Sequence, residues 1–486
     1  MVKSPPNVSG EERSRALLRD TAACYRFVKT TAAACKLSSG FPSYLETTRT
    51  LLSHIGQLSA STLDFLKRFP SQIPDNPADY RRRRQNLLLI RDAWSSLHRY
   101  VQPAVDADTL SVPTELVRLL TDRVQLLEKC ESQEFAVIHT NRLNYFQFPP
   151  GDFEETMVQL GKAISAQPGL EFPSSLGLIA LPNSQANHLF LNGLLAHEIG
   201  HIVFAKLNIL DRINSSISKG LADAFKPPAD LQLKDGDGAK LHQDLEGWAE
   251  ELFCDLFGVH LLGPSFVLAS IEFFDLANLL TLDGKIDKVA AKSHFEFETG
   301  DPHPAKLFRV WRQADLLDRL GWWDKIADCA SHHVQLMSEC RALQQGSLGL
   351  KRESEQHGAM VIDAFFRSIQ AIEDEVWAVA SPLRNDDDVV SEVRDFTEVK
   401  KEIWNCLRHA IVPSTLWIDG AFRIPSETIL LNAAHLFYLS GIEDLIAKSD
   451  GPNVDGVGLR DIWMERVENW TTKALEDISM SRNGEK

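Results

Sequence analysis

The sequence predicts an α+β fold that is predominantly helical, with a small mixed sheet near the middle of the chain. Two observations predict it. Apolar residues recur at helical spacing from about residue 11 to 132, and again from 187 to the end. Between these stretches lie short runs rich in Val, Ile, Phe and Tyr, which are typical of strands. We therefore expect an N-terminal helical region at 1–133, a mixed core at 134–345 and a C-terminal helical region at 346–486.

Proline and glycine divide the N-terminal region into several helices. The helical pattern is interrupted at Gly40, at Pro70 and between Pro74 and Pro77. A further helix is expected to open at Ser111, which can cap it, with Pro113 in its first turn.

The middle of the chain changes its pattern near residue 134. Runs at 135–139, 143–148 and 176–181 have the composition of strands, and Pro182 stops the last one. A helix is expected between them at about 153–166. Helical spacing returns from 187 onward.

The charge balance limits the partners. The 486 residues carry 67 acidic and 51 basic side chains, a formal net charge of -16. Such a field repels nucleic acids and anionic membrane surfaces. We expect neither as a partner.

Cysteine usage and hydropathy predict a cytoplasmic location. Seven cysteines are scattered without any CxxC pair, which argues against a disulfide framework and against a thiolate zinc site. The most apolar stretch, 257–282, contains Glu272 and Asp275 and is a poor fit to a membrane span. The first residues lack the apolar core of a signal peptide.

Residues 197–201 carry the main chemical signal, because they read His-Glu-Ile-Gly-His. On a helix, His197 and His201 lie one turn apart on the same side, so both imidazoles can reach one zinc ion. Glu198 stands at the edge of the pair, where it can take a proton from an activated water. The flanking residues are apolar almost all round, which predicts a buried helix. The alternative is a structural cluster satisfied by hydrogen bonds alone.

A third zinc ligand is expected from a second helix. Glu251 and Asp255 are four residues apart and share a helix face, so the glutamate can bind zinc and the aspartate can orient a zinc histidine. Glu250 is the competing ligand, but its partner four residues on is Cys254. A metzincin pattern is excluded, because residue 207 is leucine where that family has histidine.

The His-Glu-x-x-His motif followed by Glu251 and Asp255 resembles the glutamate-ligand zincins, or gluzincins. This group includes the HtpX-like and CAAX-processing endopeptidases and the ImmA/IrrE-like soluble peptidases. The run from Asp301 to Arg309 is similar to the His-Pro…Arg segment of the HtpX-like branch. The resemblance covers about 175–310. A 49-residue insertion between His201 and Glu251 and the lack of membrane helices depart from it, so membrane substrates are not carried over.

The resemblance implies a zincin-like catalytic core with zinc bound by His197, His201 and Glu251. It implies that a strand before the motif helix, here 176–181, borders the cleft and pairs with an extended peptide. His303 or Arg309 is a candidate for stabilising the oxyanion. In the alternative interpretation, Arg309 holds a buried carboxylate.

The insertion between His201 and Glu251 is expected either to gate the cleft or to lie on the solvent side without a role. It contains a helical stretch at 211–225, then two prolines and the Asp-Gly-Asp-Gly run at 235–238. Its ends are tied to the two ligand helices, which favours a place near the metal.

These inferences predict a soluble zinc metallopeptidase that acts on protein or peptide substrates, with Glu198 as the general base. The alternative is a helical interaction or regulatory protein whose zincin core is latent or inactive. The helical flanks would then bind a regulatory protein partner.

Overall fold

The structure is a computed structural model of the whole chain. It describes residues 10–38, 46–69, 76–109, 114–140, 145–148, 160, 176–182, 185, 188–225, 237–329, 331–343, 345–350, 355–448 and 456–484. The chain divides into two units. Unit 1 comprises 1–114 and 133–186, and unit 2 comprises 115–132 and 187–486. The expected 134–345 core therefore contributes residues to both units.

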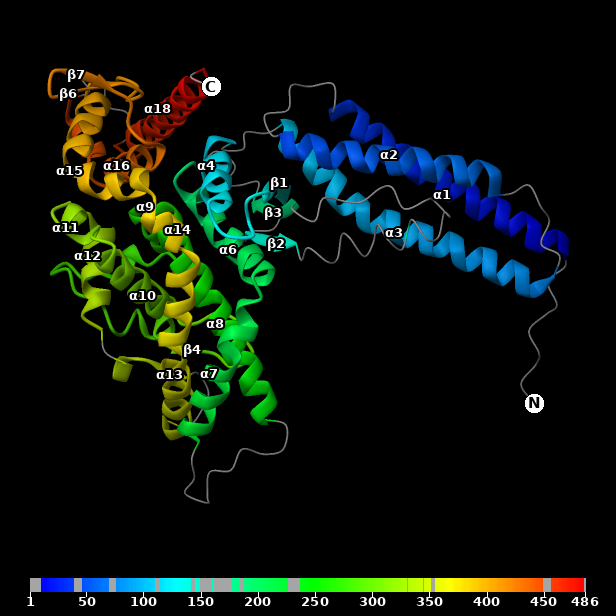
Figure 1. Cartoon of the computed structure of the whole chain (residues 1–486), viewed down its shortest axis with the longest axis horizontal. Helices are drawn as coiled ribbons and strands as arrows, with labels where there is room; N and C mark the ends of the chain where they lie inside the picture. Colours follow the sequence, from blue (N-terminus) through cyan, green and yellow to red (C-terminus); the bar gives the residue numbers. More distant parts are fainter. Residues whose placement is uncertain are drawn as a thin grey trace. The chain divides into compact units, whose positions relative to one another are not determined.

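Unit 1 is built from three long helices and a three-stranded sheet (Figure 1). The helices are α1 (Gly10–Ser38), α2 (Glu46–Arg68) and α3 (Pro77–Thr109). Asn76 caps α3, because its Oδ1 accepts from the backbone N–H groups of residues 78 and 79, and Pro77 fits the first helical position. The helices end at the predicted breaks. Their shared core includes the fully buried Trp94.

The sheet of unit 1 confirms the three predicted strands. They are β1 (Glu134–Thr140), β2 (Phe146–Phe148) and β3 (Leu176–Pro182). β3 lies in the centre, parallel to β1 and antiparallel to β2, so the sheet is mixed as expected. The expected cap at Ser111 and, apart from residue 160, the expected helix at 153–166 fall outside the described residues.

Unit 2 is mainly helical and also contains two short two-stranded sheets, of which β4–β5 is parallel and β6–β7 is antiparallel. Its helices of ten or more residues are α4 (Thr114–Gln125), α6 (Leu195–Lys206), α7 (Ile209–Ala224), α8 (Asp237–Leu262), α9 (Pro264–Phe273), α10 (Lys306–Arg319), α12 (His332–Arg341), α13 (Glu355–Val379), α15 (Asp387–Arg408), α16 (Glu427–Ser440) and α18 (Gly456–Gly484). Shorter helices are α11 (Trp323–Ile326), α14 (Ser381–Asn385) and α17 (Ile442–Lys448). Its strands are β4 (Glu296–Phe297), β5 (Gly349–Leu350), β6 (Leu416–Ile418) and β7 (Ala421–Arg423).

An aromatic cluster fixes the helices of unit 2 relative to one another. Trp248 of α8 packs on Phe297 of β4, with ring centroids 4.8 Å apart. Phe308 of α10 lies 5.4 Å from Phe297 and 5.6 Å from Phe365 of α13. These rings are fully buried, and large buried rings dominate core stability. They hold α8 and α10 in one core.

The expected C-terminal region packs directly on the elements before it. α13 lies along α7 and α8, and Arg212 of α7 pairs with Glu375 of α13 at 3.1 Å. In α16, Asn432 Oδ1 accepts from the backbone N–H of Ser265 at the start of α9, at 2.6 Å. The expected boundary between residues 345 and 346 therefore falls inside unit 2.

The described residues confirm a predominantly helical α+β fold with small sheets. Within the same residues, no helix combines the length and the apolar character that crossing a bilayer requires.

Candidate metal centre

The motif residues lie within α6, which is buried as predicted. His197 is 8% exposed and Glu198 is 7% exposed, and Ile199, Val203 and Phe204 belong to the core. α6 ends at Lys206 with Leu207 as its C-cap, after which Asn208 takes a left-handed conformation with φ of 51°. Asparagine tolerates this conformation well, and α7 begins at the next residue.

A close approach of two helices brings Glu251 to the histidines. A Cβ on Gly200, between the two histidines, would lie 2.8 Å from the Cα of Cys254 in α8. Only glycine leaves room for this packing. α8 runs on to Leu262, where Gly263 with φ of 61° ends it and Pro264 starts α9.

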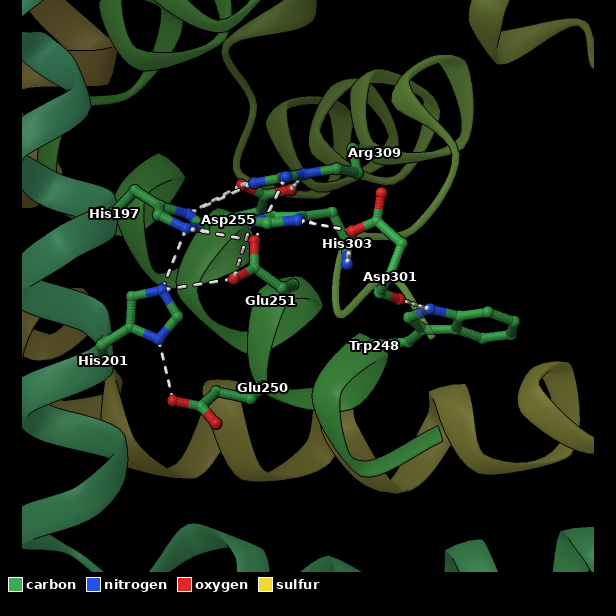
Figure 2. A network of polar contacts seen from close by, with 9 residues as sticks. All are labelled: His197, His201, Trp248, Glu250, Glu251, Asp255, Asp301, His303 and Arg309. Atoms are coloured by element: carbon green, nitrogen blue, oxygen red, sulfur yellow. Dashed lines mark hydrogen bonds and ion pairs between the residues drawn. The ribbon is translucent and has the colours of Figure 1, made fainter. Parts of the chain in front are cut away.

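His197, His201 and Glu251 converge on one point (Figure 2). The two Nε2 atoms are 3.2 Å apart. His197 Nε2 lies 3.3 Å from Glu251 Oε2, and His201 Nε2 lies 3.4 Å from Glu251 Oε1. Ligand atoms bound at about 2.0–2.1 Å to a tetrahedral zinc ion lie about 3.3 Å from one another. The three observed separations, which end on the two different oxygens of Glu251, match this spacing.

Carboxylates on the far side of each ring orient the imidazoles. His197 Nδ1 donates to Asp255 Oδ1 at 2.9 Å, and His201 Nδ1 donates to Glu250 Oε1 at 2.8 Å. A neutral imidazole has one N–H, so these bonds leave a lone pair on each Nε2. Four lone-pair atoms, two from nitrogen and two from Glu251, then face one another.

Arg309 of α10 forms ion pairs with two acidic side chains of α8. Its Nε and Nη2 donate to the two oxygens of Asp255 at 2.6 and 2.7 Å, and its Nη1 lies 3.1 Å from Glu251 Oε2. Arg309 is only 6% exposed. These contacts agree with the alternative interpretation, in which Arg309 holds buried carboxylates rather than contacting a substrate.

The electrostatics of the cluster favour a cation. Burial lowers the pKa of His197, but Glu251 and Asp255 outweigh burial and leave that pKa raised. Burial raises the pKa of Glu251, but His197 and Arg309 outweigh it and leave that pKa well below its usual range. A cluster that attracts protons in this way also attracts a divalent metal ion, which needs the same lone pairs. In addition, the buried Glu251 Oε2 forms an ion pair with Arg309 but makes no hydrogen bond with any described residue. The donor set therefore fits zinc.

Glu198 combines burial with proximity to the cluster. Burial raises the pKa of its carboxyl group, and the histidines partly oppose the shift. A raised pKa suits a carboxylate that must accept a proton and later return it.

His303 lies at the solvent-exposed side of the cluster. Its side chain is 55% exposed, and its Nε2 is 3.7 Å from Glu251 Oε1. Its Nδ1 donates to Asp301 Oδ1 at 2.7 Å, and the Trp248 indole N–H donates to the backbone carbonyl of Asp301 at 2.8 Å. The loop is thus anchored on α8 through Trp248, three residues before Glu251.

Sequence reasoning missed two features of this site. Glu250 was weighed only as a rival ligand, whereas its carboxylate contacts the Nδ1 of His201, the atom that faces away from the cluster. Asp301, which orients His303, was not considered, although its position two residues before a histidine favours such a contact. Of the expected gate, α7 corresponds to the helix expected at 211–225, and residues 226–236 lie outside the described residues.

Comparisons with protein-family models, with curated proteins and with solved structures find no match to this chain.

Proposed function

We propose that this chain is a zinc-dependent metallopeptidase with zinc bound by His197, His201 and Glu251. The observation that carries the proposal is the convergence of the two histidine Nε2 atoms and the Glu251 carboxylate, with separations of 3.2, 3.3 and 3.4 Å. The buried Asp255 and the partly exposed Glu250 support it, because each holds a histidine with its Nε2 lone pair facing the cluster.

A zinc ion held by His197, His201 and Glu251 would supply Lewis-acid polarisation of a carbonyl group and would activate water for attack. Glu198 then accepts a proton from the attacking water and delivers it to the leaving amine. Asp255 and Glu250 keep the two imidazoles in one tautomer through this cycle. Arg309 keeps Asp255 ionised, because its charge and hydrogen bonds outweigh the burial that raises the pKa of Asp255.

His303 is placed to contact the substrate. It is half-exposed, lies beside Glu251 and is oriented by Asp301. As an imidazolium its Nε2 donates a hydrogen bond, which would stabilise negative charge developing on the scissile carbonyl oxygen. We assign Arg309 a positioning role instead.

The choice of a peptide bond rests on the resemblance to gluzincins over about 175–310. We propose a zincin-like core that acts on a protein or peptide substrate. The expected pairing of an extended peptide with 176–181 is not kept, because β3 is the central strand of its sheet, with β1 on one edge and β2 on the other. We further propose a cytoplasmic location, since the six cysteines on which the structure reports are all unpaired. The helical flanks are available for a regulatory protein partner.

Hydrolysis of a fluorescently labelled unfolded protein tests the proposal directly. The wild type, loaded with zinc, is compared with Glu198→Gln, which removes the base but none of the three ligands. The account expects the variant to keep its zinc and to lose activity by about 100-fold or more. No hydrolysis by the zinc-loaded wild type, or equal hydrolysis by both proteins, would refute it and favour a latent or inactive core.

A further inference from the structure

A cavity lies within unit 2, away from the metal centre. Its volume is about 460 Å³, within the range of small-molecule sites. His260 near the end of α8, Arg319 at the end of α10 and Arg384 of α14 line it, together with Trp322 and Trp377. His260 follows Glu251 by nine residues on one helix, which corresponds to about 14 Å along the axis. The cavity is therefore distinct from the metal centre.

Positive charge is concentrated around this cavity in a chain of net charge -16. Four arginines and one acidic residue, Glu392, line it. Three of these arginines are paired with carboxylates. Arg123 pairs with Glu392, and Arg319 with Glu373, while Arg394 bonds to its neighbour Asp395. Arg384 differs, because no described carboxylate pairs with it.

Arg384 presents its guanidinium against an aromatic face. Its Cζ lies 4.0 Å from the ring centroid of Trp377, and its Nη2 donates to the backbone carbonyl of Trp377 at 2.8 Å. This hydrogen bond to a carbonyl near the C-terminal end of α13 uses one of the N–H donors of Arg384. The Nε–H of Arg384 is buried and has no hydrogen-bond partner among the described residues.

His260 adds a second unsatisfied group to the same wall. It is 6% exposed, and its ring lies edge-on to Trp377 with centroids 5.6 Å apart. Its buried Nε2 also has no partner among the described residues. Burial, aided by the charges of Arg384 and Arg319, lowers the pKa of His260 to about 3. The ring is neutral at physiological pH, and in one tautomer its Nε2 is a donor. Buried donors without partners are uncommon in folded proteins. The N–H groups of Arg384 and His260 therefore indicate a ligand that supplies hydrogen-bond acceptors.

We propose that this cavity binds a small organic anion with a flat apolar body. Arg384 and His260 hold its anionic head group, and Trp377 and Trp322 contact the flat part. Both phosphate and carboxylate offer the oxygen acceptors that these donors require, and guanidinium groups bind either one. The inference is independent of the metal centre.

Calorimetric titration of the full-length protein tests the inference with three probes of similar size. Phenyl phosphate and benzoate carry the two head groups, and benzyl alcohol is the uncharged control. At least one anion should bind with a Kd of about 1 mM or tighter, as expected for ligands of about ten heavy atoms. Benzyl alcohol should bind at least 10-fold more weakly. The stronger of the two anions identifies the head group.

Two variants and a matched control place the binding in this cavity. Arg384→Gln and His260→Phe should each weaken binding of the anion by about 10-fold or more, because each removes a donor. Arg466 also stacks on a tryptophan, Trp463, at 4.7 Å, but it does not line the cavity. Arg466→Gln should bind as the wild type does. Circular dichroism shows whether each variant is folded. If Arg384→Gln does not fold, the affinity of His260→Phe alone decides whether the anion binds in this cavity.

The proposal is overturned if neither anion binds the wild type, or if benzyl alcohol binds equally well. It is also overturned if the folded cavity variants retain wild-type affinity. In those cases the arginines serve only in their ion pairs and, for Arg384, in its contacts with Trp377.

Discussion

Asp255 is the residue whose replacement should separate a metal centre from a structural ion-pair cluster. It is 1% exposed, accepts from His197 Nδ1 at 2.9 Å and receives two further hydrogen bonds from Arg309. Asp255→Asn keeps the shape of the side chain but removes its charge. The amide can no longer serve both partners equally well, so His197 loses its fixed tautomer.

The size of the effect follows from these contacts. A hydrogen bond to a charged group contributes about 1.5–3 kcal/mol, and about 1.4 kcal/mol corresponds to a tenfold change in affinity. Zinc affinity should therefore fall by about 10- to 100-fold, as is usual for the partner of a metal-bound histidine. Breaking a buried ion pair costs about 3–5 kcal/mol of folding free energy. We expect Asp255→Asn to lower the free energy of unfolding by an amount near the lower end of this range, because Arg309 keeps its contact with Glu251 at 3.1 Å.

Glu250→Gln is the matched control, since Glu250 makes the equivalent contact with His201 Nδ1 at 2.8 Å. Its side chain is 37% exposed, so water can replace the lost contact. We expect less than about a 10-fold loss of zinc affinity and a change in stability within about 0.5 kcal/mol. Competition with a chromophoric chelator measures affinity, and urea denaturation measures stability. Equal zinc affinity in the wild type and Asp255→Asn would refute the reasoning.

Two further predictions concern the packing and the exposed side of the site. Gly200→Ala places a methyl group 2.8 Å from the Cα of Cys254. It should therefore lower the free energy of unfolding by about 1–3 kcal/mol and weaken zinc binding. Urea denaturation measures the stability, and an unchanged value would contradict the close packing of α6 on α8. His303→Ala should lower kcat by about 10-fold or more while the zinc content stays unchanged, because His303 lies beside Glu251 but is not one of the converging ligands. Steady-state kinetics measures kcat. An unaltered kcat would remove His303 from the mechanism.

Local patterns were sufficient to predict most helices and the three strands of unit 1. Glycine and proline disfavour helices through backbone geometry alone, so the ends of α1 at Ser38 and of α2 at Arg68 could be predicted without knowing the fold. The two-unit division was not foreseen. It depends on contacts between distant segments, such as Arg123 of α4 with Glu392 of α15, which are separated by 269 positions. Periodicity contains no information about such pairs.

The candidate site shows the same limit. The spacing of His197, His201, Glu251 and Asp255 placed them on shared helix faces, and the structure brings all four together. The role of Glu250 could not be read from helix phasing, because it depends on how α6 and α8 pack across Gly200. The partners of Arg309 likewise required the position of α10, which the buried aromatic cluster determines.

Zinc content is the measurement that tests the central claim most directly. Elemental analysis of the purified wild type should give about one zinc per chain, with Glu251→Gln losing the metal and Glu250→Gln retaining it. Absence of zinc from the wild type after loading would contradict the account, as would retention by Glu251→Gln together with loss by Glu250→Gln.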